Sequence, residues 1–390
     1  MKCIPLIIIG LLLAIGAQQY FYHQNKDYPP LYPNQMQNEI TEPLPLLDNN
    51  GKIIKEGWAR RPFWQYERAK VKDFTKLRTK EWDYYLVVSQ KYKFGVAATI
   101  SDLNYGGLFA LTYIDLENCS TSQIDTMQFF TFGGVNLSSK SNIDNVVKFS
   151  NKDFSIHFER QSQNRYIIVS APTLKINGNT ERVGLWANLT LKHPDALESM
   201  NIATSWKEDR SSFYLNEKVT GMKAYGTVKV DETTININSD EDDTYAVLDW
   251  GRGKWTYQNR WYWGSLSAKV DGGDFAFNLG YGFSDRSPAT ENVLIYNNVV
   301  SKIGNVIFDI PVENGVKMYM KNWKIKSDDG RLNMDFVPVV DRSSLVNFLV
   351  IKSDQHQVFG KFSGNATLDD GRILNFSNIY AFAEDVFNRW

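Results

Sequence analysis

Two carboxyl residues stand out because each lies in a segment crowded with aromatic side chains. Asp249 precedes a run in which four of the chain's eleven tryptophans fall within fourteen residues, and Glu291 follows further along the same segment. Burial against aromatic faces disfavours the charged form of a carboxyl group and raises its pKa, which makes it a usable general acid near neutrality. Aromatic faces also stabilise the cation that forms when an alkene is protonated. We therefore predict Asp249 and Glu291 as catalytic acids for chemistry on an apolar substrate.

The same segment supplies the side chains that we predict to bind a ligand. Tryptophan faces would form an apolar or cation-tolerant wall, and the polar residues between them would orient the ligand. Strand alternation puts Trp261 and Trp263 on one face and Arg260 with Tyr262 on the other, but it does not say which face lines a cavity. The candidate ligand-binding residues are Trp250, Arg252, Trp255, Arg260, Trp261, Trp263, Asn278, Asp285 and Asn292.

A purely structural role would explain the same residues. Asp249 would then pair with Arg252 or Arg260, and the tryptophans would fill a barrel instead of lining a cavity. Breaking a buried ion pair costs about 3–5 kcal/mol, so stability alone can require such residues. Both interpretations stay open, and the sequence by itself slightly favours the structural one.

The sequence carries none of the common motifs for metal, nucleotide or nucleophile chemistry. Its two cysteines and four histidines show no metal-ligand spacing, and it has no glycine-rich phosphate loop and no GxSxG motif. We therefore predict no metal and no cofactor. The 43 basic and 44 acidic residues are mixed along the chain, so we also predict no nucleic-acid partner.

The pattern around these residues is that of an all-β protein with few short helices. Apolar and polar residues alternate, and aromatic residues make up 14% of the chain. Turn dipeptides such as Asn177-Gly178 and Asp271-Gly272 predict antiparallel hairpins. Residues 67–76 and 195–200 are the weak helical candidates. Because closing a sheet removes its unpaired edges, we predict two antiparallel barrels or half-barrels in tandem.

The first residues predict a targeting segment. Lys2 precedes an apolar run from Ile4 to Ala17, which is shorter than the ~20 residues of a membrane-spanning helix and typical of a signal peptide. An uncleaved membrane anchor is the alternative. We expect export to the periplasm or cell envelope, or anchorage to the membrane through this segment. The domain prediction is a signal peptide or anchor at 1–17, a linker at 18–42, a first β-domain at 43–220 and a second at 221–390.

Motifs spread along residues 40–390 resemble those of a known family, the domain of unknown function 2804 family. The resemblance implies no assigned activity. It does imply the organisation of two-domain lipocalin-like proteins, which include carotenoid hydratases, tocopherol cyclase and pericyclase-type enzymes with isoprenoid or otherwise apolar ligands. We therefore expect both β-domains to be lipocalin-like. The motifs are Gly57-Trp58-Ala59-Arg60-Arg61-Pro62, Phe213-Tyr214-x-Asn216-x-Lys218, Asp249-Trp250-Gly251-Arg252-Gly253-x-Trp255, Trp261-x-Trp263, Asn278-Leu279-Gly280-x-Gly282-Phe283-x-Asp285, Thr290-Glu291-Asn292 and Ala381-Phe382-Ala383-Glu384-Asp385-Val386.

Three functions fit these observations. The first is an exported or membrane-anchored protein that binds an apolar or amphipathic small molecule, lipid-like or isoprenoid, in a β-barrel cavity. The second is a cofactor-independent lyase or isomerase, hydratase- or cyclase-like, with Asp249 or Glu291 as proton donor. The third is a structural protein of the envelope. The absence of a catalytic motif ranks binding slightly above catalysis, and we expect the site in the second β-domain or between the two.

Overall fold

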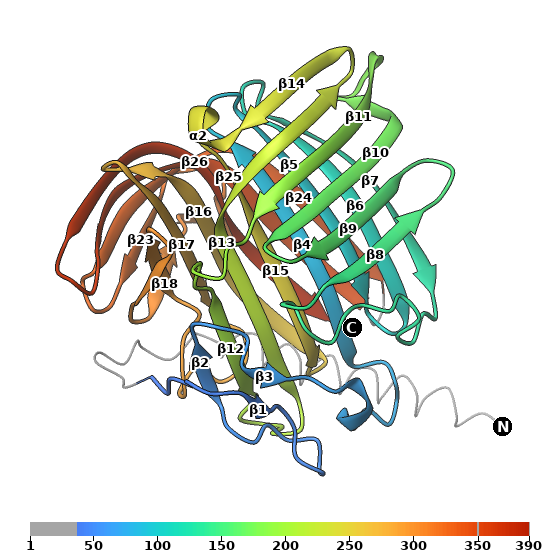
Figure 1. Cartoon of the computed structure of the whole chain (residues 1–390), viewed down its shortest axis with the longest axis vertical. Helices are drawn as coiled ribbons and strands as arrows, with labels where there is room; N and C mark the ends of the chain where they lie inside the picture. The colour runs from blue at the N-terminus through green and yellow to red at the C-terminus, as the bar shows by residue number, and fades with distance from the viewer. Residues whose placement is uncertain (1–36, 349–350, 390) are drawn as a thin grey trace. The chain divides into compact units, whose positions relative to one another are not determined.

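The computed structural model describes residues 37–348 and 351–389, and strands dominate this part of the chain (Figure 1). Within these residues the main elements are a 13-stranded sheet and a 9-stranded sheet, each curled into a half-barrel. Pairing within both sheets is antiparallel between consecutive neighbours, as in β4 with β5 and β25 with β26. The prediction of an all-β fold with two half-barrels is confirmed.

The first sheet is built from residues 57–254. Its long strand β13 pairs with β15 and β12 along its first half and with β11 and β14 along its second half. The strand order is β7 (Ser120–Phe129), β6 (Gly106–Asp115), β5 (Phe94–Asp102), β4 (Thr79–Ser89), β15 (Thr244–Lys254), β13 (Phe213–Val230), β11 (Asn179–Lys192), β10 (Asn164–Ile176), β9 (Ser155–Gln161) and β8 (Asn145–Ser150), with β12 (Met200–Ser205), β14 (Thr233–Asn238) and β2 (Gly57–Ala59) beside this path.

The second sheet is built from residues 258–389. Its strand order is β19 (Val299–Lys302), β18 (Val293–Tyr296), β17 (Gly273–Tyr281), β16 (Gln258–Val270), β26 (Ile373–Arg389), β25 (Ile351–Thr367), β24 (Leu332–Phe348), β23 (Trp323–Ser327) and β20 (Val306–Asp309). The remaining described elements are short: the pair β1 (Leu44–Pro45) with β3 (Trp64–Gln65), the pair β21 (Val312–Glu313) with β22 (Val316–Lys317), the 3-10 helix η1 (Arg68–Lys70) and the helix α2 (Ser239–Asp242).

The predicted turn dipeptides form hairpins because their residues adopt the left-handed backbone that a tight turn requires. Asn177 and Gly178 join β10 to β11, and Asp271 and Gly272 join β16 to β17; all four have positive φ angles between 48° and 77°. Asparagine, aspartate and glycine tolerate this left-handed backbone, which matches the twist of the flanking strands. The helical predictions were less successful. Residues 67–76 contain only η1, and residues 195–200 form no helix.

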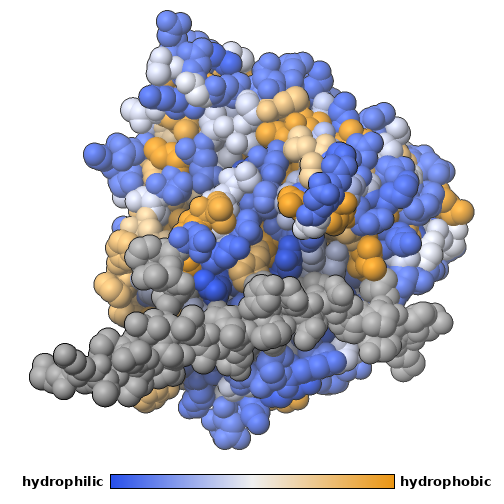
Figure 2. Space-filling view, turned by 180° about the vertical axis from the view of Figure 1, so that it is seen from behind, coloured by the Kyte–Doolittle hydropathy of each residue, from blue (hydrophilic) through white to orange (hydrophobic). Residues whose placement is uncertain are grey.

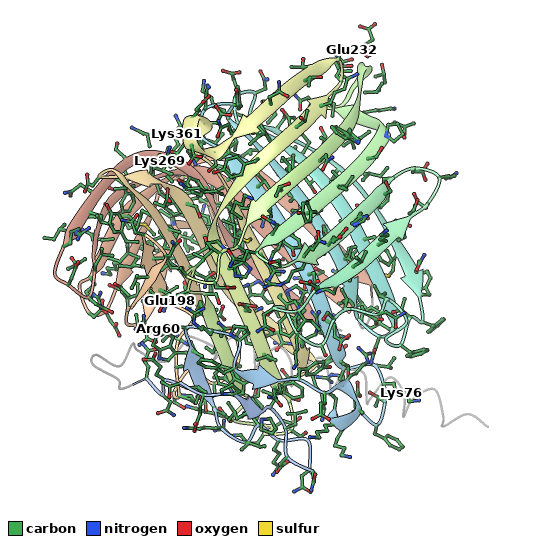
Figure 3. The ribbon with its side chains drawn as sticks, viewed as in Figure 1. Arg60, Lys76, Glu198, Glu232, Lys269 and Lys361 are labelled. Atoms are coloured by element: carbon green, nitrogen blue, oxygen red, sulfur yellow. The ribbon has the colours of Figure 1, made fainter. Side chains whose placement is uncertain are left out.

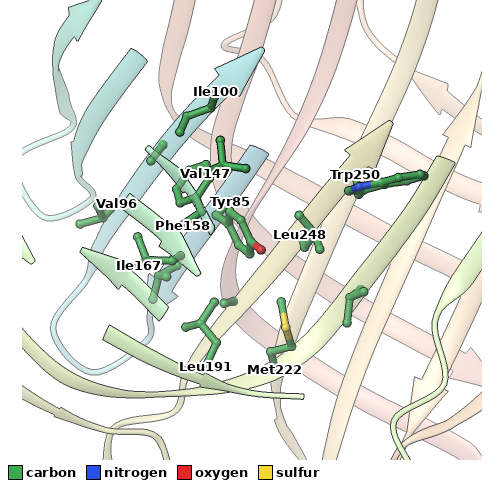
Figure 4. Close-up of a cluster of buried hydrophobic side chains, with 14 of the residues drawn as sticks. Tyr85, Val96, Ile100, Val147, Phe158, Ile167, Leu191, Met222, Leu248 and Trp250 are labelled. Carbon is green, nitrogen blue, oxygen red and sulfur yellow. The ribbon is translucent and has the colours of Figure 1, made fainter. Parts of the chain in front are cut away.

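Alternation along the strands creates two buried layers. One face of the first sheet encloses its own core, which includes Tyr85, Phe158, Leu191 and Leu248 (Figure 4). The opposite face, with Tyr84 and Val247 among its residues, packs against Trp263, Phe359 and Phe382 of the second sheet. A strand of the first sheet that borders both buried layers therefore directs consecutive side chains alternately into one layer and the other.

The first N-terminal residues that the structure describes contact the body of the protein. Asn38 and Ile40 exchange backbone hydrogen bonds with Trp58 of β2, and Ile40 is buried. Arg60 then forms an ion pair of 3.0 Å with Glu198, beside which it is drawn in Figure 3. Residues 37–42 of the predicted linker are thus part of the fold, while the remainder of the linker and the predicted targeting segment lie outside the described residues.

The predicted domain boundary does not coincide with the change of sheet. Strand β13 crosses residues 220 and 221 within the first sheet, and the chain passes to the second sheet between Lys254 and Gln258. The described residues belong to one compact unit. A division at 220/221 into independently folding domains stays a prediction.

The exposed surface has the mixed character of an ordinary protein surface. On the face shown in Figure 2, hydrophobic residues occur in groups separated by hydrophilic ones. Among the helices that the structure describes, none has the length and apolar character needed to cross a membrane.

Candidate functional site

The first predicted acid, Asp249, lies where the two sheets face each other. It sits on β15 directly opposite Lys218 of β13 and Tyr84 of β4, so that these three side chains share one face of the first sheet. The Lys218 Nζ lies 2.6 Å from Asp249 Oδ2, and the Asn216 Nδ2 donates to Asp249 Oδ1 at 2.6 Å. The partner of Asp249 is therefore a lysine, and the predicted pairing with Arg252 or Arg260 is wrong.

Lys218 is a residue of the first sheet whose side chain also contacts the second sheet. Its Nζ lies 3.7 Å from the centre of the Trp263 ring on β16, in cation–π geometry. Its side chain is only 4% exposed, and that of Asp249 is 12% exposed. The ammonium group is thus held between a carboxylate of the first sheet and an indole of the second.

Glu291, the second predicted acid, reaches the same cluster from the turn before β18. The backbone of Gly280 leaves room for it: a methyl group at Gly280 would lie 2.9 Å from Glu291 Oε2. Burial raises the pKa of Glu291 to about 7; the Asp249 charge adds to this increase, and the Lys218 charge opposes it. Glu291 also forms a side-chain hydrogen bond with Tyr214 of β13, whose own pKa is raised, first by burial and then by the Glu291 charge. Asp249 and Glu291 are therefore brought together as electrostatically coupled groups.

A third carboxyl group, Glu384 of β26, completes the cluster. Its Oε1 accepts a hydrogen bond of 2.8 Å from Trp261 Nε1, and its Oε2 accepts one of 3.1 Å from Gln357 Nε2. Burial raises the pKa of Glu384 to about 7, against the opposing effects of the Trp261 hydrogen bond and the Lys218 charge. The Lys218 charge thus acts on two carboxyl groups whose pKa values are near neutrality. We call Lys218, Asp249, Glu291 and Glu384 the carboxylate cluster.

Aromatic rings surround one side of the carboxylate cluster. Phe283 is the centre of this aromatic wall, with edge-to-face contacts between ring centres of 4.7 Å to Tyr214, 4.7 Å to Trp255 and 5.5 Å to Trp261. Trp82 joins it at 5.3 Å from Trp255. Trp82 is possible there only because Gly251 faces it, since a methyl group at Gly251 would lie 1.9 Å from the Trp82 ring. The structure thus places two of the predicted ligand-binding residues, Trp255 and Trp261, in this wall, beside the acids.

Four of the predicted ligand-binding residues lie elsewhere. Trp250 and Arg252 alternate with Asp249 along β15 and so face the interior of the first sheet, where Arg252 pairs with Asp83 at 3.0 Å. Arg260 faces the interior of the second sheet and binds Asp385 through two hydrogen bonds, of 2.8 and 2.6 Å. Asp285 forms an ion pair of 2.9 Å with Arg210 in a loop. We conclude that the two arginines and Asp285 serve the fold and not the carboxylate cluster.

The two predicted asparagines support the site without belonging to it. Asn278 accepts a hydrogen bond of 2.7 Å from Trp263 Nε1 and donates one of 2.9 Å to the Glu291 carbonyl. Asn292 accepts one of 2.8 Å from the Gly280 backbone and donates one of 2.8 Å to the Gly304 carbonyl. Together they fix the backbone from which the Glu291 side chain projects and the ring over which Lys218 lies.

Three residues of the cluster and its surroundings were missed as site residues, although a signal for them existed. Tyr214 and Lys218 occupy alternating positions of one motif, and Glu384 occupies another motif near the C-terminus. Alternation alone would have placed Tyr214, Asn216 and Lys218 on the same strand face. What the sequence did not contain was the pairing of that face with Trp263 and Glu384, which lie far away along the chain.

The raised pKa of Glu291 predicts a particular dependence of stability on pH. The folded protein holds this proton up to about pH 7, whereas the unfolded chain releases it near the ordinary value of 4.5. Because the folded state binds more protons between these values, the contribution of Glu291 to stability is lost as the pH rises from about 4.5 to about 7. Glu291→Gln, which mimics the protonated acid, should therefore gain stability relative to the wild type between pH 5 and pH 8, by on the order of 3 kcal/mol.

Urea unfolding of the two proteins at pH 5 and pH 8 measures this difference, and taking the variant against the wild type cancels the titration of other groups. A free-energy difference between the two proteins that does not change with pH would contradict a raised pKa at Glu291.

Comparisons with solved structures identify proteins that resemble this chain. One is kievitone hydratase from Nectria haematococca, with a TM-score of 0.48 and 12% sequence identity over 80% of this chain and 88% of that one. Another is AttH from Nitrosomonas europaea, with a TM-score of 0.46 and 10% identity over 82% and 98% of the two chains. A third is CghA in complex with Sch210972, with a TM-score of 0.45 and 7% identity over 80% and 87%.

The comparison with curated proteins found no match. The comparison with protein families did: the model for the domain of unknown function DUF2804 matches residues 37–390. This match covers the motifs that carried the resemblance and all of the residues that the structure describes, so the chain belongs to the DUF2804 family.

Proposed function

We propose that the protein is a cofactor-independent lyase or isomerase that acts on an apolar, alkene-containing substrate. The observation that carries this proposal is the carboxylate cluster: Glu291 and Glu384, both with pKa values of about 7, lie with one lysine beside an aromatic wall. Carboxyl groups with pKa values near the working pH are suited to both giving and taking a proton.

In the proposed reaction Glu291 is the proton donor. The π electrons of the alkene take the Glu291 proton, and the resulting cation lies against the faces of Trp255, Trp261 and Phe283. Glu384 then removes a proton from a neighbouring carbon, whose C–H electrons form the new double bond. In the hydratase direction Glu384 instead takes a proton from the water that adds to the cation.

Other groups hold these acids in place. Tyr214 hydrogen-bonds Glu291, and Trp261 and Gln357 hydrogen-bond Glu384. The Lys218 charge favours the ionised form of either glutamate, and the Asp249 charge opposes it.

The experiment that tests the proposal uses an extract of apolar metabolites from the producing cells. After incubation with the wild-type protein, mass spectrometry should detect a product that is isomeric with one component or differs from it by one water. The double variant Glu291→Gln/Glu384→Gln should give none, and circular dichroism establishes that it is folded. A folded double variant that forms the same product would show that these acids do not carry the reaction.

Ligand binding without turnover is the second candidate function. The aromatic wall supports it, because edge-to-face rings offer an apolar surface to an isoprenoid or lipid-like molecule. A lipid that co-purifies with the wild type and returns unchanged from the extract assay would favour binding over catalysis. Export or membrane anchorage is part of both proposals and rests on the apolar run at Ile4 to Ala17.

A further inference from the structure

Two adjoining cavities lie within the first sheet, on the side of β13 and β15 opposite the carboxylate cluster. The larger has a volume of about 200 Å³ and the smaller about 160 Å³, and both are lined by Pro62, Phe63 and Asn142. Each far exceeds the ~10–15 Å³ that one buried water requires. Each is also below the ~300–1,000 Å³ of pockets for drug-sized ligands. We call them the polar chambers, and their size suits a small molecule.

Two oppositely charged groups in the larger polar chamber lack part of their hydrogen bonding. Glu217 is 2% exposed, and its Oε1 accepts a hydrogen bond of 2.7 Å from Ser199, but its Oε2 has no partner among the described residues. Arg160 contacts His193 at 3.2 Å, but its Nε has no partner there either. A buried donor or acceptor without a partner bears the full penalty of its lost hydration. Both groups line the same chamber, so a ligand could satisfy both.

The smaller polar chamber repeats this arrangement with neutral groups. The Trp250 Nε1 and the Ser141 Oγ are buried and have no hydrogen-bond partner among the described residues. Trp250 therefore belongs to a different site from the one predicted for it.

The chemistry of these free atoms identifies the class of ligand. They comprise one acceptor (Glu217), two donors (Arg160 and Trp250) and one hydroxyl group (Ser141). The charged residues that line the larger chamber are also balanced, with Arg61 and Arg160 against Asp195 and Glu217. A hydroxyl group both donates and accepts, so several of them on one neutral molecule match this set. We propose that the polar chambers bind a small, uncharged, polyhydroxylated molecule of monosaccharide size.

This site is independent of the proposed reaction. Its ligand is polar where the proposed substrate is apolar, and Glu217 and Trp250 point away from Lys218 and Asp249 because they alternate with them along β13 and β15. The two proposals can therefore fail separately.

Titration calorimetry with glucose and myo-inositol as probes tests the proposal on the full chain. At least one probe should bind the wild type at millimolar concentration. Glu217→Gln, which replaces a charged acceptor by a donor, should weaken binding about tenfold or more, and Trp250→Phe, which removes only the indole N–H, by about three- to tenfold. The matched controls Glu181→Gln and Trp186→Phe on β11 should bind like the wild type. Glu291→Gln should do so as well.

Three results would overturn the proposal: no binding of either probe, binding that Glu217→Gln and Trp250→Phe leave unchanged, or displacement of the probe by acetate, which would indicate an anion site. Thermal unfolding curves of each variant establish that it is folded. Loss of turnover in Glu291→Gln with intact probe binding would keep the two sites distinct.

Discussion

The Glu291→Gln variant should lose about 10²–10⁴-fold in turnover, the range that a positioned general acid contributes. Glutamine keeps the shape of the side chain and can occupy the space beside Gly280, but it has no proton to give. Steady-state rates on the substrate found in the extract assay measure the loss. The matched control is Glu313→Gln, an exposed glutamate of β21 that should turn over like the wild type.

The pH dependence of the steady-state rate provides a second test of the same prediction. Donation requires protonated Glu291, and acceptance requires ionised Glu384, and both groups have pKa values of about 7. The wild-type rate should therefore follow a narrow bell-shaped dependence on pH, centred near neutrality. In Glu291→Gln the fall of the rate on the alkaline side should disappear with the donor. A folded variant with the full rate and an unchanged bell would exclude Glu291 as the acid.

The Lys218→Met variant should lose about 3–5 kcal/mol of stability, because it leaves Asp249 buried without its counter-ion. Methionine retains the packing over the Trp263 ring, so the change reports mainly on charge. Urea unfolding at neutral pH measures it. The control on the same strand is Lys223→Met: that lysine is 29% exposed and pairs with Asp240 and Asp274, and its removal should cost about 1 kcal/mol or less.

A second substitution distinguishes the ion pair from simple packing. Lys218→Met/Asp249→Asn removes both charges and should recover a large part of the lost stability, as a double-mutant cycle would show. The double variant should also raise the pKa of Glu384 less than Lys218→Met alone, since the Lys218 charge lowers that pKa and the Asp249 charge raises it. Additive losses in the cycle would contradict direct coupling between Lys218 and Asp249.

The local structure of this protein could be read from its sequence to a considerable depth. The turn dipeptides predicted the hairpins, and β16 pairs with β17 on either side of Asp271-Gly272. Trp261 and Trp263 share a face, as predicted, and both point toward the first sheet. These features depend on residues close together in the chain, where turn geometry fixes the register.

The composition of the site was less accessible to sequence reasoning. Asp249 and Trp250 were both placed in one site although neighbours on a strand face opposite ways, and the structure separates them into different layers. The partnership of Lys218 with Asp249 depends on β13 pairing with β15, and that of Glu384 with Trp261 on β26 pairing with β16. Such long-range pairings are set by the closure of the whole sheet, which local patterns do not encode.

The alternation of side chains along strand β13 restricts which insertions and deletions the sequence can tolerate. Glu217 and Lys218 are consecutive, yet one faces the polar chambers and the other the carboxylate cluster. Losing or gaining a single residue between Phe213 and Lys218 would exchange the two faces, placing an ammonium group among the chambers' donors and a fourth carboxyl group beside Asp249, Glu291 and Glu384. Substitutions in this stretch alter one site at a time, whereas a change in its length would disrupt both sites at once. Relatives that keep either function should therefore preserve the number of residues here more strictly than their identity.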